Sequence, residues 1–355
     1  MNPKVVFWLS RRPEQADREL IGPKAAGLCT LRRLGMKVPP CFFVTTAAFR
    51  EHLDTNGLRP QMATRPDKMP GAENDTPAQI ELGQKLYFER RLSVNGKQSC
   101  NDCHMVDQNR AGVDHEPTSD GAEGKRGSRN SPTTLNAGFH FAQFWDGRAK
   151  DLVEQAKGPV LNPVEMAMPE EKEVVKRLEA DADYPKLFQA AFPGEDKPIS
   201  YHNFARAVAA FERTLITHDR FDDFLKGDDK ALSTQELAGL SLFLSAGCTT
   251  CHVGPTIGGN MYQKIGIVHP YANTNDVGRL KITGEKWDQY SFKVPSLRNV
   301  ALTYPYFHDG RVEDLNAAVK QIAHMQLGKE LTDKDVSALT AFLHCLSDKT
   351  RKGPR

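Results

Sequence analysis

The chain has 355 residues, which is enough for two or three domains with substantial hydrophobic cores. Its formal net charge is only +2 and its acidic and basic residues are interspersed, so charge gives no argument for binding nucleic acid or an anionic membrane. No apolar run in the sequence approaches the length of a membrane-spanning helix.

Residues 1–60 differ in pattern from the rest of the chain. The segments 21–28 and 34–50 resemble the opening of the nucleotide-binding domain of the phosphoenolpyruvate synthase and pyruvate phosphate dikinase family. Pro23 replaces a glycine of that family's Gly-Gly-Lys turn, and Cys41 replaces the glycine after the paired prolines. Because proline cannot donate a backbone N–H to a phosphate, we interpret residues 1–60 as a non-functional fragment rather than an ATP site.

Residues 61–75 lack apolar periodicity and are punctuated by Pro66, Pro70 and Gly71, which predicts a linker. The sequence 76–79, Thr-Pro-Ala-Gln, then supplies an N-cap, a proline for the first turn and a capping-box partner. A helix is therefore predicted to begin at this point and to lead toward the first cysteine motif.

Two Cys-X-X-Cys-His motifs follow, and they are formed by Cys100, Cys103 and His104 and by Cys248, Cys251 and His252. Two thiols one helical turn apart can each add to a porphyrin vinyl group, while the adjacent histidine ligates the iron. A zinc knuckle or a redox pair is the alternative, but zinc sites place their second cysteine pair about 12–20 residues away. The motifs predict two covalently bound haem c groups, with His104 and His252 as the proximal iron ligands.

The surroundings of the two motifs form an internal repeat. The stretch 81–88 before the first motif is similar to 236–243 before the second. After the first motif, Pro132, Asn136, Phe144 and 146–148 recur with the same spacing as Pro295, Asn299, Phe307 and 309–311. Trp145 stands where the second copy has His308. The chain therefore contains two copies of one haem-binding unit.

The remaining pattern is helical with long loops. Phe204, Val208, Phe211 and Leu215 recur at helical spacing and predict one buried helix face. Further capping signals at Ser233 and Thr332 begin helices before and after the second haem motif. We predict a mainly α fold of two cytochrome c-like haem domains, residues 76–230 and 231–348. The cysteines outside the motifs, which we expect to be packed or free thiols, are Cys29, Cys41 and Cys345.

From residue 76 to 348 the chain resembles the bacterial di-haem cytochrome c peroxidases. The phrases that carry this resemblance are 127–133, 142–148, 154–160 and 295–300. The resemblance implies an enzyme that reduces hydrogen peroxide to water in the periplasm. Its electrons would come from a small cytochrome c or a cupredoxin, and the family's members form homodimers.

The resemblance also implies roles for individual residues. The haem on the first motif would be the low-potential peroxidatic centre, with Glu165 and Gln155 over its open face, and the haem on the second motif the high-potential centre that receives electrons. Trp145 would lie between the haems on the electron route. A calcium ion would be bound by Asn130 and by the backbone carbonyls of Thr303 and Pro305.

A carboxylate at Glu165 suits the chemistry, because cleavage of a bound peroxide needs a group that takes a proton from one oxygen and returns it to the other. The alternatives are ordinary structural roles. Glu165 could be a solvated surface acid, Gln155 a helix-surface amide and Trp145 a core tryptophan.

Two departures from the family pattern affect the iron ligands. At the position of a loop histidine that ligates the first haem at rest, this chain has Ala122, and the nearest candidate is His115. We expect the first haem to keep an open site without reductive activation. The strict alignment places Ile322 at the position of the methionine that ligates the second haem, so we predict Met325, one turn later, with His324 as the competitor and core packing as the alternative for Met325.

Other functions remain open at this stage. One is an oxidase of the same superfamily that acts on a partner protein, although its members use tyrosine as the second distal ligand. Another is a non-enzymatic di-haem electron carrier or haem sensor. Haem attachment makes a periplasmic location the expectation, but the apolar run 5–9 is too short for a signal peptide. A chain without a leader would remain haem-free in the cytoplasm.

Overall fold

The computed structural model describes residues 6–8, 42–44 and 65–353. The chain divides into two units, residues 1–63 and 64–355. In the first unit, strand β1 (Val6–Trp8) pairs antiparallel with β2 (Phe42–Val44). The predictions for Cys29, Cys41 and the resemblance to a nucleotide-binding domain lie almost entirely outside the described residues.

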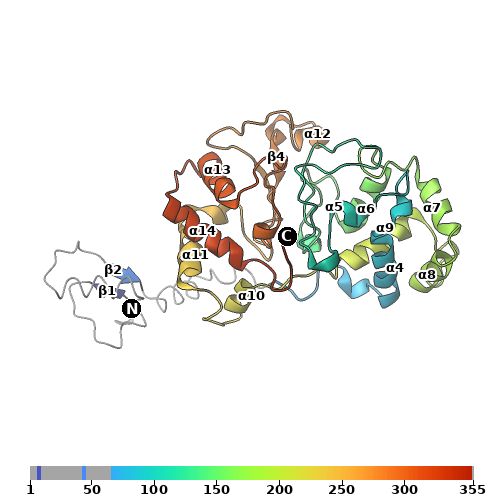
Figure 1. Cartoon of the computed structure of the whole chain (residues 1–355), viewed down its shortest axis with the longest axis horizontal. Helices are drawn as coiled ribbons and strands as arrows, with labels where there is room; N and C mark the ends of the chain where they lie inside the picture. The colour runs from blue at the N-terminus through green and yellow to red at the C-terminus, as the bar shows by residue number, and fades with distance from the viewer. Residues whose placement is uncertain (1–5, 9–41, 45–64, 354–355) are drawn as a thin grey trace. The chain divides into compact units, whose positions relative to one another are not determined.

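The second unit is mainly helical, as predicted (Figure 1). Its helices are α4 (Pro77–Tyr87), α5 (Cys100–Cys103), α6 (Leu152–Leu161), α7 (Glu171–Glu179), α8 (Tyr184–Ala191), α9 (Tyr201–Glu212), α10 (Arg220–Leu225), α11 (Thr234–Ala246), α12 (Leu280–Thr283), α13 (Leu315–Leu327) and α14 (Asp333–Cys345). Strands β3 (Tyr262–Lys264) and β4 (Ser291–Lys293) form an antiparallel pair. Long irregular segments connect these elements.

The predicted helix starts are confirmed by their caps. The side chains of Thr76, Ser233 and Thr332 each accept a hydrogen bond from the backbone N–H three residues on. At each cap the third residue bonds back, which completes a capping box. These local signals fix where α4, α11 and α14 begin.

The internal repeat is a repeated helix pair, in which α4 packs on α9 and α11 packs on α14. A Cβ at Gly83 would lie 1.9 Å from the carbonyl oxygen of Ala207, and a Cβ at Gly239 would lie 1.9 Å from that of Ala338. Both crossings therefore require glycine, because the backbones touch. Gly83 is therefore structurally equivalent to Gly239. A position-by-position alignment of 81–88 with 236–243 would instead pair Gly83 with Ala238, one residue earlier.

The second unit has two lobes in Figure 1, with α4, α6, α8 and α9 in one and α11, α13 and α14 in the other. Helix α10 was predicted to belong to the first haem domain, but the ring of Phe221 packs edge-on against Phe342 of α14 at 5.4 Å. This contact joins α10 to a helix of the second repeat, and the boundary at residue 230 stays a prediction.

Part of the segment predicted to be a linker is anchored in the folded unit. The side chain of Arg65 is buried and donates to Asp222 at 2.6 Å, and Met69 is 1% exposed. The chain after residue 348, outside the predicted domains, is also bound, because Arg351 donates to the carbonyl oxygens of Val106 and Arg110. Both segments lie on the core rather than apart from it.

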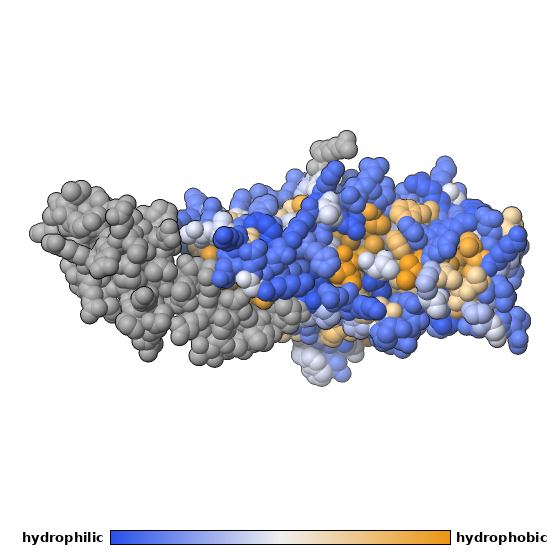
Figure 2. Space-filling view, turned by 90° about the horizontal axis from the view of Figure 1, so that it is seen from below, coloured by the Kyte–Doolittle hydropathy of each residue, from blue (hydrophilic) through white to orange (hydrophobic). Residues whose placement is uncertain are grey.

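The surface seen in Figure 2 is mostly hydrophilic, with apolar patches over the lobe that contains α4 and α9. Cys345 is fully buried and unbonded, as predicted. None of the helices in the described part of the chain has both the length and the apolar character needed to cross a membrane.

Candidate functional site

A cavity in the first lobe brings the first cysteine motif together with the predicted catalytic side chains. Cys100, Cys103 and His104 line it with Gln155 of α6 and Glu165. We call it the first-haem cavity. The residues predicted from distant parts of the sequence therefore converge on one space.

His104 follows α5 directly, and its ring is held by a backbone carbonyl. Its Nδ1 donates to the carbonyl oxygen of Pro132 at 2.9 Å, which leaves Nε2 as the nitrogen available to a metal. Burial lowers the pKa of His104, so its imidazole is neutral, as iron ligation requires.

A second cavity repeats this arrangement and is lined by Cys248, Cys251 and His252. We call it the second-haem cavity. His252 Nδ1 donates to the carbonyl oxygen of Ile257 at 3.1 Å, and burial lowers the pKa of His252 to about 4. Both motifs therefore present a neutral imidazole with a fixed ring.

The two cavities fit haem rather than zinc. Within residues 65–353, no three His, Cys, Asp or Glu side chains cluster as a metal-binding group, and none of the four motif cysteines is in a disulfide. His308 lines the second-haem cavity and is 2% exposed, yet neither ring nitrogen has a hydrogen-bond partner. A cofactor with polar substituents, such as the propionates of haem, would satisfy such a ring. In the sequence, the only indication that His308 belongs to a functional site is that the equivalent position of the first repeat is Trp145.

Glu165 faces the first-haem cavity rather than open solvent. Its Oε1 accepts a hydrogen bond from Asn162 Nδ2 at 2.6 Å. Burial raises the pKa of Glu165, and the Asn162 hydrogen bond and the charge of Arg148 oppose this rise. The side chain is therefore suited to holding or releasing a proton inside the cavity.

Sequence reasoning missed other polar side chains that line the first-haem cavity, among them Ser119, Asp120, Arg129 and Glu212. Glu212 ends α9 and is 4% exposed. Glu212 directly follows Phe211, a member of the predicted buried stripe. This position is the only feature of the sequence that indicates that Glu212 is buried.

The loop that follows the first motif places no second imidazole in the first-haem cavity. His115 Nδ1 donates to the carbonyl oxygen of Tyr304 at 2.9 Å, and the two rings lie 4.5 Å apart. Ala122 donates its backbone N–H to the carbonyl oxygen of Glu165 at 2.7 Å. Among the described lining residues, His104 is the only histidine.

Trp145 lines the second-haem cavity and is also bonded to the segment that holds His104. Its Nε1 donates to the carbonyl oxygen of Asn130 at 2.9 Å, two residues before Pro132. The backbone N–H of Asn130 donates to the carbonyl oxygen of His308 at 2.8 Å. Trp145 is therefore connected to both haem units through short contacts.

The predicted calcium residues lie on two segments that one loop connects. The side-chain amide of Asn130 donates to the carbonyl oxygens of Glu116 and Pro117 at 3.0 and 3.4 Å. Thr303 and Pro305 flank Tyr304, whose carbonyl is bound by His115 of the same loop.

Helix α13 presents its face around Ile322, Ala323 and Gln326 to the second-haem cavity. Met325 is 6% exposed but is not on the cavity lining. His324 is also outside the lining, because its Nδ1 pairs with Glu330 at 2.5 Å at the surface. The structure therefore does not bring the predicted distal ligand to the second cavity, and ligation by Met325 stays a prediction.

Comparison with known proteins agrees with this geometry. A family model described as di-haem cytochrome c peroxidase matches residues 77–230, and one described as pyruvate phosphate dikinase, AMP/ATP-binding domain, matches residues 18–84. The solved structure of a MauG-like protein associated with microbial copper homeostasis superposes with a TM-score of 0.70 at 29% identity, covering 81% of this chain and 94% of that one.

Two curated relatives match most of the chain. It is 49% identical over 276 residues to cytochrome c551 peroxidase of Pseudomonas aeruginosa, which covers 76% of this chain and 79% of that protein. It is 44% identical over 270 residues to cytochrome c551 peroxidase of Nitrosomonas europaea, covering 75% and 79%. Identity at this level, over most of both proteins, shows that the chain belongs to the di-haem cytochrome c peroxidase family.

Proposed function

We propose that the protein reduces hydrogen peroxide to water, using electrons from a small cytochrome c or a cupredoxin. Support comes from the first-haem cavity, where Glu165 and Gln155 share a buried space with the Cys100–His104 motif. An enzyme that handles peroxide needs this combination of a haem site and a proton carrier. The named peroxidases among the relatives support the same activity.

In this proposal Glu165 moves the proton within peroxide. The first haem, when bound through Cys100, Cys103 and His104, supplies the redox chemistry. Glu165 takes a proton from one peroxide oxygen and returns it to the other as the O–O bond breaks, which yields water as the leaving group. The Asn162 hydrogen bond holds the carboxyl in place, and the Gln155 amide orients the substrate.

Cys248, Cys251 and His252 would hold the second haem, which would supply the centre that accepts electrons, and Trp145 would be the route between the two sites. The contacts of Trp145 with Asn130 and with the second-haem cavity support this role. Two electrons and two protons are consumed for each peroxide, and two water molecules result.

A calcium ion at the junction of the two haem units is part of the proposal. The amide nitrogen of Asn130 is committed to the 116–117 loop, so its oxygen is directed elsewhere. The carbonyl oxygens of Thr303 and Pro305 accept no hydrogen bond from any described residue. Amide and carbonyl oxygens are suitable calcium ligands. We also propose a periplasmic location and a homodimer, as in the family.

The test is donor oxidation by peroxide. The full chain is matured in a host that attaches haem c, and reduced small cytochrome c or reduced cupredoxin is mixed with it before peroxide is added. Oxidation of two donor molecules per peroxide is expected. Failure to oxidise either donor, in a protein whose absorbance shows both haems attached, would overturn the proposal. The matched control is Glu154→Gln, a carboxylate of α6 that pairs with Lys157 and does not line the cavity.

A further inference from the structure

Glu212 is a buried carboxyl for which the proposed peroxide chemistry has no use. It is the last residue of α9, is 4% exposed and lines the first-haem cavity. Its Oε2 is buried and has no hydrogen-bond partner. An unpaired carboxyl in such a place is costly, so a structural role alone does not explain it.

The groups around Glu212 do not neutralise it. The neighbouring Arg213 is bound to Asp75 by two hydrogen bonds of 2.5 and 2.6 Å. On α4, Tyr87 donates its hydroxyl to the carbonyl oxygen of His104 at 2.7 Å and is not bonded to Glu212. On α5, the nearby titratable group is Cys100, which becomes a thioether when haem is attached. Across the same cavity lies Glu165, which hydrogen-bonds to Asn162.

The internal repeat shows that the fold does not need a carboxyl at this position. A Cβ at Gly83 would lie 3.0 Å from Phe211 Cβ, and a Cβ at Gly239 would lie 2.9 Å from Phe342 Cβ. Phe211 and Phe342 are therefore equivalent, and the residue after each is Glu212 in one repeat and Leu343 in the other. Leu343 is 5% exposed and lines the second-haem cavity. Only the first cavity carries a carboxyl there.

We propose that Glu212 couples reduction of the first haem to the uptake of one proton. One electron arrives from the donor, and one proton arrives from solvent onto a carboxylate oxygen of Glu212. An added electron in a cavity of low dielectric repels a nearby carboxylate, so the proton offsets the new charge. Glu212 acts as a positioning residue for charge and does not touch peroxide.

The titration of Glu212 supports this proposal. Burial raises the pKa of Glu212 to about 8, and the charge of Arg213 opposes the rise. Reduction of the haem removes one positive charge from the cavity, so the pKa of Glu212 is higher beside the reduced haem than beside the oxidised haem. At a pH between the pKa of Glu212 beside the oxidised haem and its pKa beside the reduced haem, reduction is accompanied by uptake of one proton. The potential of the first haem therefore falls as pH rises. The limiting slope for a one-electron couple is about 59 mV per tenfold change in proton concentration.

The experiment is a redox titration of the haem-loaded full chain, followed by absorbance between about pH 6 and pH 10. The variants are Glu212→Gln, which keeps a polar side chain of similar size, and Glu212→Leu, which copies the second repeat. Glu165→Gln is the control, because it removes a different carboxyl that lines the same cavity. We expect the wild type and Glu165→Gln to show the slope, and both Glu212 variants to lose it.

A slope that persists in Glu212→Gln would overturn the proposal. So would a wild-type first haem whose potential does not change with pH, and that measurement needs no variant. The proposal rests on the proposed role of the first haem as the peroxidatic centre, but the potential is measured without turnover. Absence of peroxidase activity together with a normal slope would therefore contradict the proposed function and leave the role of Glu212 standing.

Discussion

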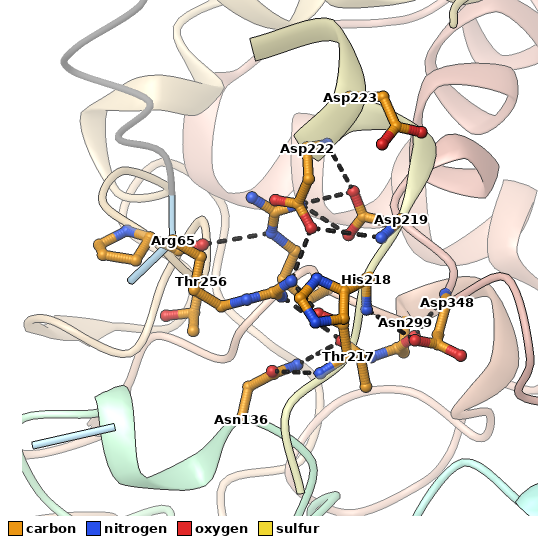
Figure 3. Close-up of polar contacts among 12 residues, drawn as sticks. Arg65, Asn136, Thr217, His218, Asp219, Asp222, Asp223, Thr256, Asn299 and Asp348 are labelled. Carbon is orange, nitrogen blue, oxygen red and sulfur yellow. Dashed lines mark hydrogen bonds and ion pairs between the residues drawn. The ribbon is translucent and has the colours of Figure 1, made fainter. Parts of the chain in front are cut away.

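Asn136 and Asn299, which occupy equivalent positions in the two repeats, donate their side-chain amides to the same hydroxyl, Thr217 Oγ1, at 2.8 and 3.2 Å (Figure 3). All three residues are fully buried. Each asparagine has a positive φ of about 60° and begins a short 3₁₀ turn. Thr217 lies in the connection between α9 and α10, so one hydroxyl joins the two repeats.

A buried ion cluster surrounds this hydroxyl in Figure 3. Arg298 donates to both oxygens of Asp219 at 2.7 and 2.6 Å, and both side chains are 0% exposed. Arg65 pairs with Asp222 at 2.6 Å and also binds Thr217. The cluster combines residues from the N-terminal segment, the α9–α10 connection and the second repeat. It is therefore the place where the two haem units become one folded unit.

Replacement of Thr217 tests this connection. Thr217→Val keeps the shape of the side chain but leaves the amides of Asn136 and Asn299 without an acceptor. A buried unpaired donor costs about 1–3 kcal/mol, so we expect the free energy of unfolding to fall by roughly 2–4 kcal/mol. Denaturant unfolding of the haem-loaded protein measures this loss.

Thr217→Ser is the matched control, because it removes a methyl group and retains the hydroxyl. We expect it to lose less than half as much stability as Thr217→Val. Equal losses in the two variants would show that packing, rather than the shared hydroxyl, joins the repeats.

Glu165→Gln tests the proton carrier. The amide fills the same space and can hydrogen-bond to Asn162, but it cannot accept the peroxide proton. We expect kcat to fall about 10²- to 10⁴-fold, with the absorbance of both haems unchanged. A variant that retains most of its activity would remove Glu165 from the mechanism.

The same residue predicts a pH dependence. Glu165 must be deprotonated to take a proton, and burial raises its pKa, so activity is expected to fall as pH decreases through this raised pKa. Glu165→Gln should lose this acidic limb of the rate profile. An unchanged limb in the variant would assign it to another group.

The first haem is expected to be open in the oxidised protein. His115 is bonded to Tyr304 and lies outside the cavity lining, so His115→Ala should leave the high-spin EPR signal and the peroxide turnover of the oxidised enzyme unchanged. Ala122→His, which places an imidazole in the aligned loop position, should produce a low-spin first haem that needs reduction before it turns over. A low-spin signal in the wild type that His115→Ala abolishes would reverse this assignment.

Features encoded by local spacing were predictable from the sequence. The Cys-X-X-Cys-His motifs and the caps at Thr76, Ser233 and Thr332 depend on residues within one helical turn of one another. The buried stripe from Phe204 to Leu215 depends on helical periodicity and is confirmed, because its four members are 0–7% exposed. The resemblance to a known family located Gln155 and Glu165 on the first-haem cavity.

Features that depend on long-range packing were not predictable. The packing of α10 against α14 depends on the contact between Phe221 and Phe342, which are far apart in the sequence. Burial of Arg65 depends on Asp222 and Thr217, contacts that the nearby proline and glycine residues do not indicate. The importance of Glu212 depends on the cavity that α9 faces, and a glutamate at a helix end gives no such signal by itself.

The distal side of the second haem can be decided by two variants of α13. Residues 322 and 325 differ by three positions, so they point about 60° apart around a helix of 3.6 residues per turn. The structure turns Ile322 toward the second-haem cavity and leaves Met325 off its lining, where Met325 is 6% exposed. If α13 keeps this orientation when haem is bound, Met325→Leu, which keeps the volume and the apolar surface, leaves the absorbance and potential of the second haem unchanged.

Ile322→Met supplies the complementary change, because it places a thioether on the cavity wall. A thioether ligand raises the potential of a haem, so we expect this variant to shift the second haem to a higher potential and a low-spin spectrum. If Met325→Leu instead lowers the potential of the second haem, Met325 ligates the iron, and α13 must turn when haem binds. If neither variant has an effect, the iron's sixth position lies beyond the reach of both side chains, and α13 serves only as an apolar wall.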